Sequence, residues 1–474
     1  MNRREFSKKA GIIAATTFAV NPAYSIFQNK EFVTKRPPVN ERLFSSDAIE
    51  DVIVKVKKKL KDPELASLFE NCFPNTLDTT VFYKEVNGKP LTHIITGDIN
   101  AMWLRDSTCQ VWPYIPYANK DEKLKKMIAG LINWQVECVL VDPYANAFKK
   151  DKFETTHWKD DFTEMKEELH ERKWEINSLL FVIRLCYEYW KITADTSPFD
   201  DTWEKSMLLI HQTLKEQQRF DNPGPYSFMR ESTQANEVIA NNGYGRPTRK
   251  IGMIHATHRQ DDACVFPFYV PDNLMAVLEL KHLSEMFDKI KNNKQHAKLC
   301  LEMAEQVDKA IKEYAIINHR VFGDMYAFEV DGYGSHLLLE ESTVPNLMSL
   351  PYIGACSIDD PVYQNTRKWL LSDWNPKFVR GKRDEGIGST HYAEPPKRIW
   401  PLSTISRALT TNDTKEITFC VEQLKRSSAG TGFIHESYIP DKPEEFSRPW
   451  FSWVNTYFGE MILILLETHP TLLV

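Results

Sequence analysis

Three segments of the chain carry apolar residues at alternating steps of four and three, the spacing that puts side chains on one face of a helix. These segments span residues 124–138, 176–190 and 276–290. A fourth run, residues 461–466, is apolar on every side, which indicates an inner helix enclosed by its neighbours. Strand-like runs are few and lie among turn-forming glycine and asparagine residues, as at 91–96 and 320–330. The pattern predicts an all-α fold class with minor β-hairpins.

The N-terminal end of the chain has a different character. Arg3 and Arg4 precede an apolar run over residues 10–20, which is followed by the segment NPAYS over residues 21–25. This order resembles a twin-arginine export signal, and the apolar run is shorter than the ~20 residues that span a bilayer. We expect residues 1–28 to form this signal, and the mature protein to be exported to the periplasm without membrane attachment. An uncleaved tail and a membrane anchor are the alternatives.

Residues 40–474 contain no Gly/Ser linker and no break in composition, so we expect residues 29–474 to form a single domain with a short N-terminal arm. Charged residues crowd the segment 149–173. We interpret this segment as a solvated insertion or helix face rather than as a binding element.

Charge and composition narrow the class of ligand. The chain has 59 Lys and Arg residues against 65 Asp and Glu residues, and its net charge of -6 gives no general attraction to nucleic acid. Aromatic residues make up 12% of the chain, and flat rings with a polar edge suit a sugar-binding cleft as well as a core. The 8 cysteines are scattered without a CxxC pair or a Cys/His cluster at metal spacing. We therefore expect a neutral ligand and no metal or cofactor, while a disulfide stays open.

Residues 96–107 form the first segment with candidate chemistry. Trp103 offers a stacking face, Arg105 a rigid donor fork and Asp106 an acceptor, which together can hold neighbouring hydroxyls of a sugar. The alternative is that Asp106 or Ser107 caps a helix and that Arg105 pairs with the cap.

A second segment, residues 172–179, carries Trp174, Glu175 and Asn177 at the start of a predicted helix. These side chains could line the same cleft. The alternative is an ordinary helix N-terminus, where the helix dipole stabilises acids, and the pattern alone slightly favours it.

A third segment, residues 252–263, holds the adjacent pair Asp261 and Asp262 after His258 and Arg259. Adjacent side chains diverge on a helix and alternate faces on a strand, so the two aspartates cannot point into one pocket alike. An acid that protonates a leaving oxygen has to hold its proton near neutral pH, which a second carboxylate or apolar walls promote. The alternative is an ordinary Arg/Asp ion pair.

The fourth segment, residues 430–438, is bounded by glycine and proline and is predicted to be a loop that carries His435 and Glu436. A lone glutamate between aromatics gains no helical salt bridge there, which favours a functional role. Beyond it, Asn455 and Tyr457 can reach the cleft, although the aromatic residues around them can equally belong to a core.

In order and spacing, several motifs resemble glycoside hydrolase family 125 over nearly the whole mature chain: TGDINAMWLRDSTCQVWPY, RKWEINSLLF, DDACVFPFYVPDN, VPNLMSLPYIG, GIGSTHY with IWPLSTISRALT, GFIHESY and WFSWVNTYFGEMIL. The resemblance implies an (α/α)6 barrel with its active site in a funnel at one end. It also implies the release of terminal α-1,6-linked mannose by an exo-acting, inverting and metal-independent hydrolase. The expected ligand is a mannose-containing oligosaccharide or N-glycan.

By position, the resemblance makes Asp261 or Asp262 the general acid, with Asp261 preferred, and Glu436 the base that activates water. The grip on the terminal mannose is assigned to Trp103, Arg105 and Asp106, which are also similar to the WxRD motif of glucoamylase-type barrels. The remaining candidates for substrate contact are His391, Trp174, Glu175, Asn177, His258, Arg259, His435, Asn455 and Tyr457.

The sequence departs from the family pattern at three places. His258-Arg259-Gln260 stands in place of Arg-Pro-Ser, residues 340–343 stand in place of Asp-Asp-Ala-Asn, and Asn177 stands where an aspartate is common. These differences lie near the sugar-binding positions, so they bear on the sugar and linkage specificity more than on the reaction class. The alternatives are a glucoamylase-type exo-α-glucosidase and a catalytically inactive carbohydrate-binding barrel.

Overall fold

The predicted apolar stripes become three long helices in the computed structural model, which describes residues 32–391 and 396–474. The stripes lie in α5 (Glu122–Val141), α6 (Ile176–Thr193) and α8 (Val270–Lys289), so these helix predictions are confirmed. Most of their apolar positions are buried in one core and the others pack against it partly buried, because an amphipathic helix gains stability by removing its apolar face from water. The predicted export signal, residues 1–28, lies outside the described residues.

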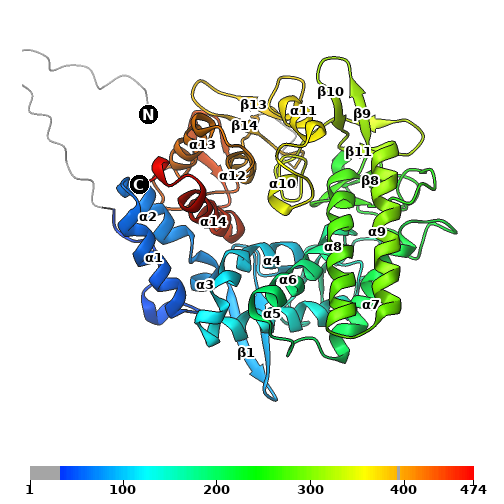
Figure 1. Cartoon of the computed structure of the whole chain (residues 1–474), viewed down its shortest axis with the longest axis horizontal. Helices are drawn as coiled ribbons and strands as arrows, with labels where there is room; N and C mark the ends of the chain where they lie inside the picture. The colour runs from blue at the N-terminus through cyan, green and yellow to red at the C-terminus, as the bar shows by residue number, and fades with distance from the viewer. Residues whose placement is uncertain (1–31, 392–395) are drawn as a thin grey trace, which may run out of the picture. The chain divides into compact units, whose positions relative to one another are not determined.

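Within residues 34–474, the helices lie in two layers around a common centre (Figure 1). The inner helices are α4 (Leu104–Val111), α6, α8, α10 (Leu350–Ile353), α12 (Pro401–Leu409) and α14 (Ser452–Thr468). Contacts join them in the order α12, α14, α4, α6, α8 and α10. The outer positions hold α1 (Asp47–Lys59), α2 (Pro63–Cys72), α3 (Asn75–Thr79), α5, α7 (Asp201–Glu216), α9 (Lys294–Tyr314), α11 (Pro361–Leu370) and α13 (Thr414–Ser427).

Helix α14 carries the run predicted to be fully enclosed. Residues 452–462 and Leu465 of this helix are buried, residues 463, 464 and 466 are half-buried, and residues 467 and 468 are exposed. The inner position is therefore confirmed, although the end of the apolar run reaches the surface.

The helix starts differ between the two layers. In the outer layer, Asp121 caps α5, Asp200 caps α7 and Asp413 caps α13 by accepting backbone N–H bonds of the first turn. In the described structure, the six inner helices begin without a side-chain cap, after Trp103, Glu175, Tyr269, Ser349, Trp400 and Phe451. The side chains that precede the inner helices thus have no capping role.

The β-structure consists of short antiparallel pieces. Two-stranded hairpins are β1 (Val81–Val86) with β2 (Lys89–Ile94), β6 (His258–Arg259) with β7 (Asp262–Ala263), β9 (Ile316–His319) with β10 (Gly323–Tyr326), β13 (Phe378–Arg380) with β14 (Glu385–Ile387), and β15 (Ser437–Ile439) with β16 (Lys442–Ser447). Three-stranded pieces join β3 (Met102–Trp103), β4 (Ala147–Phe148) and β5 (Leu169–Glu171), and β8 (Phe268–Tyr269), β11 (Glu329–Val330) and β12 (His336–Leu337). The predicted run 320–330 therefore divides between two different sheets.

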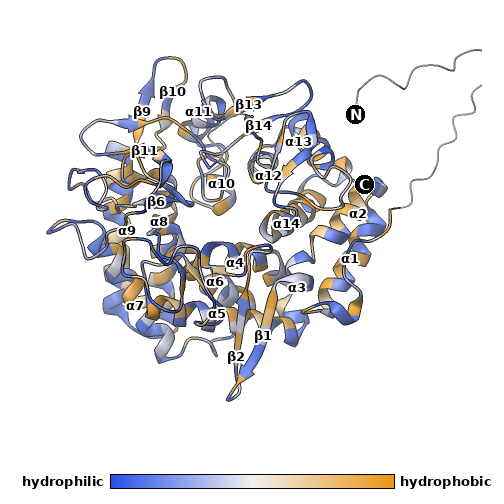
Figure 2. Cartoon of the chain, turned by 180° about the vertical axis from the view of Figure 1, so that it is seen from behind, coloured by the Kyte–Doolittle hydropathy of each residue, from blue (hydrophilic) through white to orange (hydrophobic). Residues whose placement is uncertain are grey.

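The remaining regular elements are the short 3-10 helices η1 (Val39–Glu41), η2 (Trp112–Lys120), η3 (Ala235–Glu237) and η4 (Pro470–Leu472). Hydropathy colouring shows that polar residues gather on the outer faces and on the loops (Figure 2). No helix in the described ranges is long and apolar enough to cross a membrane. All eight cysteines are free thiols.

Candidate active site

A cavity of about 800 Å³ opens among the loops that precede the inner helices. It brings together segments that are far apart in the sequence. Six of the predicted site residues line this cavity: Trp103, Arg105, Asp106, Asp261, His391 and Glu436. Its wall also contains Trp400, Phe451 and Trp453, which are aromatic residues at the starts of α12 and α14.

The Trp103, Arg105 and Asp106 group is held from behind by α6. The Arg105 guanidinium donates to the Glu175 carboxylate at 2.5 Å and to the Asn177 side-chain carbonyl at 3.1 Å. It also lies 3.3 Å from Asp106. Arg105 is 2% exposed, so water does not compete for these bonds, and they fix the planar guanidinium in one orientation.

The capping alternative for this segment is wrong. The N-cap residue of α4 is Trp103, which makes no side-chain cap bond, and the Ser107 hydroxyl donates to the Trp103 carbonyl at 2.7 Å. Asp106 points to the cavity instead. Its burial and the charges of Asp261 and Glu436 raise the pKa of Asp106 to about 6, against the effect of Arg105.

The β6–β7 hairpin separates the two adjacent aspartates. Gln260 and Asp261 form its turn and have φ values of 37° and 81°, the left-handed backbone of a two-residue hairpin. The Asp261 N–H donates to Glu175 at 2.8 Å, and the Asp261 carbonyl accepts from the Lys173 ammonium at 2.7 Å. In the described part of the chain, no group donates a hydrogen bond to the Asp261 carboxyl, which faces the cavity.

Asp262 points away from this cavity and is fully engaged. Its carboxylate accepts from the Asn236 amide at 2.8 Å and from the Thr390 hydroxyl, and it lies 3.8 Å from the His391 ring. Burial would raise the pKa of Asp262, but hydrogen bonding to His391 and the positive charge of Arg259 lower it to about 2. Asp262 is therefore a charged structural anchor, and of the two aspartates only Asp261 is placed to donate a proton.

His391 connects this anchor to the cavity. The hydrogen bond to Asp262 raises the pKa of His391 to about 9, against the effect of burial. The imidazole is therefore protonated at neutral pH, and its half-exposed ring can donate to a ligand oxygen.

Glu436 reaches the cavity from the loop before β15. One carboxylate oxygen accepts from the Ser447 hydroxyl at 3.0 Å, and the other lies 3.4 Å from the Arg448 guanidinium. Arg448 in turn donates to Asp98 at 2.9 Å. Sequence reasoning missed Arg448 and Asp98, because their role depends on this contact between distant loops.

Gly97 explains why these loops can meet. It has a φ of 133°, and an added Cβ would clash with the Trp450 carbonyl oxygen. The Asp98 N–H donates to this same carbonyl at 3.1 Å. A side chain at position 97 would therefore push the loop before α4 away from the loop before α14.

The other predicted contact residues lie outside the cavity wall and support it. Glu175 and Asn177 brace Arg105, and Asn177 also donates to Asp272 at 2.9 Å. Asn455 accepts from the Ile434 N–H at 2.9 Å and thereby holds the Glu436 loop. The remaining members are buried side chains with internal partners: Trp174, His258, Arg259, His435 and Tyr457.

Two departures from the family pattern contact each other. The Arg259 guanidinium lies 3.1 Å from the Glu341 carboxylate and 2.8 Å from Glu329. Removing one member would leave a buried charge without its partner. Arg259 belongs to the β6–β7 hairpin and, like Glu341, does not line the cavity, so this pair affects how Asp261 is held. Thr343, in the second departure, does line the cavity and is placed to affect which sugar is contacted.

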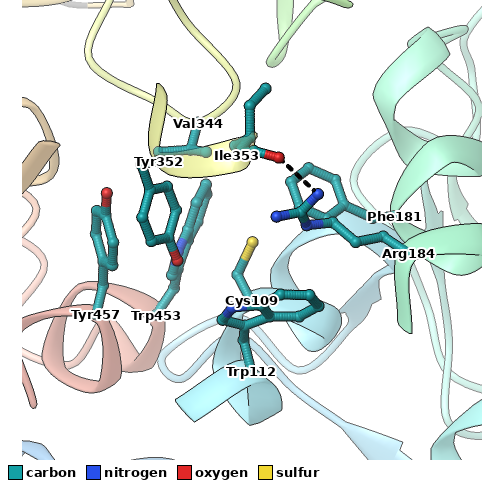
Figure 3. Close-up of a pocket in the computed structure, with 9 residues that line it drawn as sticks. All are labelled: Cys109, Trp112, Phe181, Arg184, Val344, Tyr352, Ile353, Trp453 and Tyr457. Carbon is teal, nitrogen blue, oxygen red and sulfur yellow. Dashed lines mark hydrogen bonds between the residues drawn. The ribbon is translucent and has the colours of Figure 1, made fainter. Parts of the chain in front are cut away.

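A second, much smaller cavity lies behind Trp453, which lines both spaces (Figure 3). It has a volume of about 10 Å³, the space of about one water molecule. Tyr457 lines this small cavity and donates to, or accepts from, Ser406 at 3.2 Å. Tyr457 therefore backs the floor of the large cavity and does not line it.

The charged segment 149–173 forms part of the large cavity wall. Phe153, Glu154, Thr155, His157 and Trp158 all line it. The interpretation of this segment as a merely solvated insertion is therefore corrected. Among the residues that the structure describes, no cluster of His, Cys, Asp or Glu has the arrangement of a metal site.

Comparison with known proteins agrees with this architecture. Residues 62–463 match the family described as metal-independent alpha-mannosidase (GH125). The chain is 40% identical over 458 residues to the Meiotically up-regulated gene 157 protein of Schizosaccharomyces pombe, covering 93% of this chain and 89% of that protein.

Among solved structures, the chain is similar to a metal-independent alpha mannosidase from Streptococcus pneumoniae, in a non-productive complex with alpha-1,6-mannobiose. That match has a TM-score of 0.86 and 36% identity, and it covers 90% of this chain and 99% of the other. A bacterial glucoamylase complexed with acarbose matches with a TM-score of 0.56 and 13% identity, over 87% of this chain and 57% of that chain, which indicates a shared fold only. The protein therefore belongs to the GH125 family of metal-independent α-mannosidases.

Proposed function

We propose that the protein is an exo-acting, inverting α-mannosidase that releases terminal α-1,6-linked mannose from oligosaccharides or N-glycans. The observation that carries this proposal is the shared cavity of Asp261 and Glu436, two carboxylates on separate loops, beside the Arg105 and Asp106 group. Family membership supports the sugar, and the mannobiose in the S. pneumoniae relative supports the linkage. The two-layered ring of helices is consistent with an (α/α)6 barrel, in which α10 is a one-turn inner helix.

In this mechanism, Asp261 is the general acid. Its carboxyl transfers a proton to the glycosidic oxygen while the bond from that oxygen to the anomeric carbon breaks. Asp261 suits this role because its carboxyl is unengaged while its backbone is fixed on both sides by Glu175 and Lys173.

Glu436 is the general base. It takes a proton from a water molecule, whose oxygen bonds to the anomeric carbon from the face opposite to the leaving oxygen. The Ser447 and Arg448 contacts hold both carboxylate oxygens in place, so the carboxylate does not have to reorient during the reaction. The products are β-mannose and a saccharide with a free hydroxyl.

The terminal mannose is assigned to the closed end of the cavity. Arg105 donates hydrogen bonds to hydroxyls of the sugar, and Asp106 accepts hydrogen bonds from neighbouring hydroxyls. Trp103 supplies a ring beside them. His391, which lines the same cavity, donates a further hydrogen bond to the sugar. We also propose that residues 1–28 direct export by the twin-arginine route to the periplasm, on the basis of the sequence pattern.

Linkage-defined mannobioses, with maltose as the competing substrate, test the proposed specificity. We expect fastest release of mannose from the α-1,6-linked disaccharide, no hydrolysis of maltose and no effect of a chelator. Proton NMR at early times should show the β-anomer as the first product. Faster hydrolysis of maltose or an α-anomer as first product would contradict the proposal.

A further inference from the structure

The 153–158 segment is an ordered wall rather than a loose insertion. The Thr156 hydroxyl donates to the His170 carbonyl at 2.7 Å, and the Trp158 N–H donates to the Thr156 hydroxyl oxygen at 3.2 Å. His170 packs edge-on against Trp103, with ring centroids 5.3 Å apart. The wall is therefore connected directly to the proposed site of the terminal mannose.

Arg230 fixes the ring of Trp158. Its guanidinium lies 3.7 Å from the centre of that ring and is held by two hydrogen bonds to Asp161, at 2.7 and 2.6 Å, and by one to Glu171 at 2.9 Å. Since Arg230 covers one face of the indole, a ligand can approach its other face or its edge. A ring held in this way loses little conformational entropy on binding.

The charged groups of this wall have no excess of positive charge, because two cations pair with three carboxylates. Arg230 pairs with Asp161, Glu171 and Glu237, and Lys173 pairs with Glu171 at 3.2 Å. No net positive charge is left on these paired groups to attract an anion, so a neutral ligand is favoured over a phosphorylated or acidic one.

Exposure increases from the Arg105 and Asp106 group, at the closed end proposed for the terminal sugar, to the 153–158 wall. Arg105 is 2% exposed and Asp106 is 6% exposed, whereas Trp158 is half-buried and Phe153 is 83% exposed. Phe153 and Trp158 line the same cavity, and their rings offer flat apolar faces on which sugar rings can stack. An exo-acting enzyme that holds the terminal sugar at the closed end directs the rest of its substrate along this gradient.

We infer that Trp158 and Phe153 form a binding surface for the leaving side of the substrate, with Phe153 contacting sugars beyond the one attached to the leaving oxygen. The ligand class is a neutral oligosaccharide of at least three residues. This inference rests on the proposed function, because it assumes which end of the saccharide enters the cavity first.

Chain-length kinetics test this inference. The substrates are α-mannosyl fluoride, α-1,6-mannobiose and α-1,6-mannotriose, and the variants are Phe153→Ala and Trp158→Ala. The control is Phe162→Ala, because Phe162 is 55% exposed in the same segment but does not line the cavity. Thermal unfolding of each variant shows whether the fold is retained, and Phe153→Ala is decisive if Trp158→Ala unfolds.

We expect the wild type to prefer mannotriose over mannobiose in kcat/KM. Phe153→Ala should lose about tenfold on mannotriose, and the folded Trp158→Ala should lose about tenfold on both saccharides, while each retains its rate on the fluoride. Phe162→Ala should behave like the wild type. Equal rates of the wild type on both saccharides, or equal losses by Phe153→Ala on fluoride and mannotriose, would overturn the inference.

Failure of the proposed function would be seen separately, as a wild-type protein that hydrolyses none of the three substrates. Titration calorimetry with mannotriose would then decide. Weaker binding by Phe153→Ala, but not by Phe162→Ala, would support the binding surface, and unchanged binding would refute it.

Discussion

The Glu175 carboxylate accepts the backbone N–H of Asp261 at 2.8 Å. Its second oxygen accepts from Arg105 at 2.5 Å and from the Ser178 hydroxyl at 3.1 Å. One buried carboxylate thus connects the proposed general acid to Arg105 of the proposed sugar-binding group. Glu175 was predicted to contact substrate, but its position makes it a positioning residue for both groups.

Glu175→Gln should therefore impair proton donation more than sugar binding. An amide offers one acceptor oxygen, so it cannot serve both Asp261 and Arg105, and a displaced acid can cost about 10²-fold in kcat. We expect this loss on mannobiose and a smaller loss on an activated aryl α-mannoside, whose leaving group needs no proton. Ser178→Ala is the control, since it removes the third donor and leaves the Asp261 bond. Equal losses on both substrates would show that Glu175 has no special connection to the acid.

The acid and the base should differ in their dependence on the leaving group. Glu436→Gln is expected to reduce kcat by about 10² to 10⁴-fold on aryl mannosides and disaccharides alike, because water activation is needed for both. Asp261→Asn should retain a larger share of its activity on the aryl mannoside. Asp262→Asn, whose carboxylate is engaged in structure, should show no such selectivity. Measuring kcat for the three variants on both substrates checks the assignment, and an active Glu436→Gln enzyme would refute it.

Ionisation of Asp106 makes the free energy of unfolding depend on pH. Its pKa is raised from 3.8 to about 6, so the folded state disfavours the charged form and stability falls as the pH rises from about 4 to 6. Asp106→Asn should remove this loss and stabilise the fold at pH 7 by at most ~3 kcal/mol, with no gain at pH 4. Its activity should fall because the acceptor for sugar hydroxyls is lost. Thermal unfolding at both pH values measures the effect, and an equal change at pH 4 and pH 7 would contradict it.

Arg448 should act on the rate through Glu436. In Arg448→Ala, the base loses its 3.4 Å ionic neighbour, and we expect kcat to fall by about tenfold or more while KM changes little. Arg448→Lys should recover part of the rate, because it restores the charge without the planar fork. Arg426→Ala removes an ion pair with Asp384 outside the cavity and serves as the control. A rise in KM with unchanged kcat would place Arg448 in sugar binding instead.

Export can be tested independently of the enzyme. If residues 1–28 form a twin-arginine signal, replacing Arg3 and Arg4 by lysine should retain full-length protein in the cytoplasm. The unchanged chain should be recovered in the periplasm without these residues. Fractionation and N-terminal sequencing provide the measurement. Identical distribution of the two proteins would disprove the signal.

The sequence alone determined the helical class and the position of the main helices, because a period of 3.6 residues is a local property of the chain. The caps of outer helices, such as Asp121 and Asp413, are a further local signal, which only the structure identified. The motifs in the sequence identified the segments that carry Asp261 and Glu436, since glycine, proline and adjacent carboxylates can be read from the sequence without knowing the fold.

Only the tertiary structure distinguished residues that line the cavity from residues that support it. Asp261 and Asp262 are equivalent in the sequence, and the left-handed turn of the hairpin is what directs the first to the cavity and the second to Thr390 and His391. The same holds for Arg448 and for the wall at residues 153–158, which gain their roles through contacts between distant loops. The burial of a side chain and the charges near it depend on which distant segments pack against it. The local sequence does not specify these contacts.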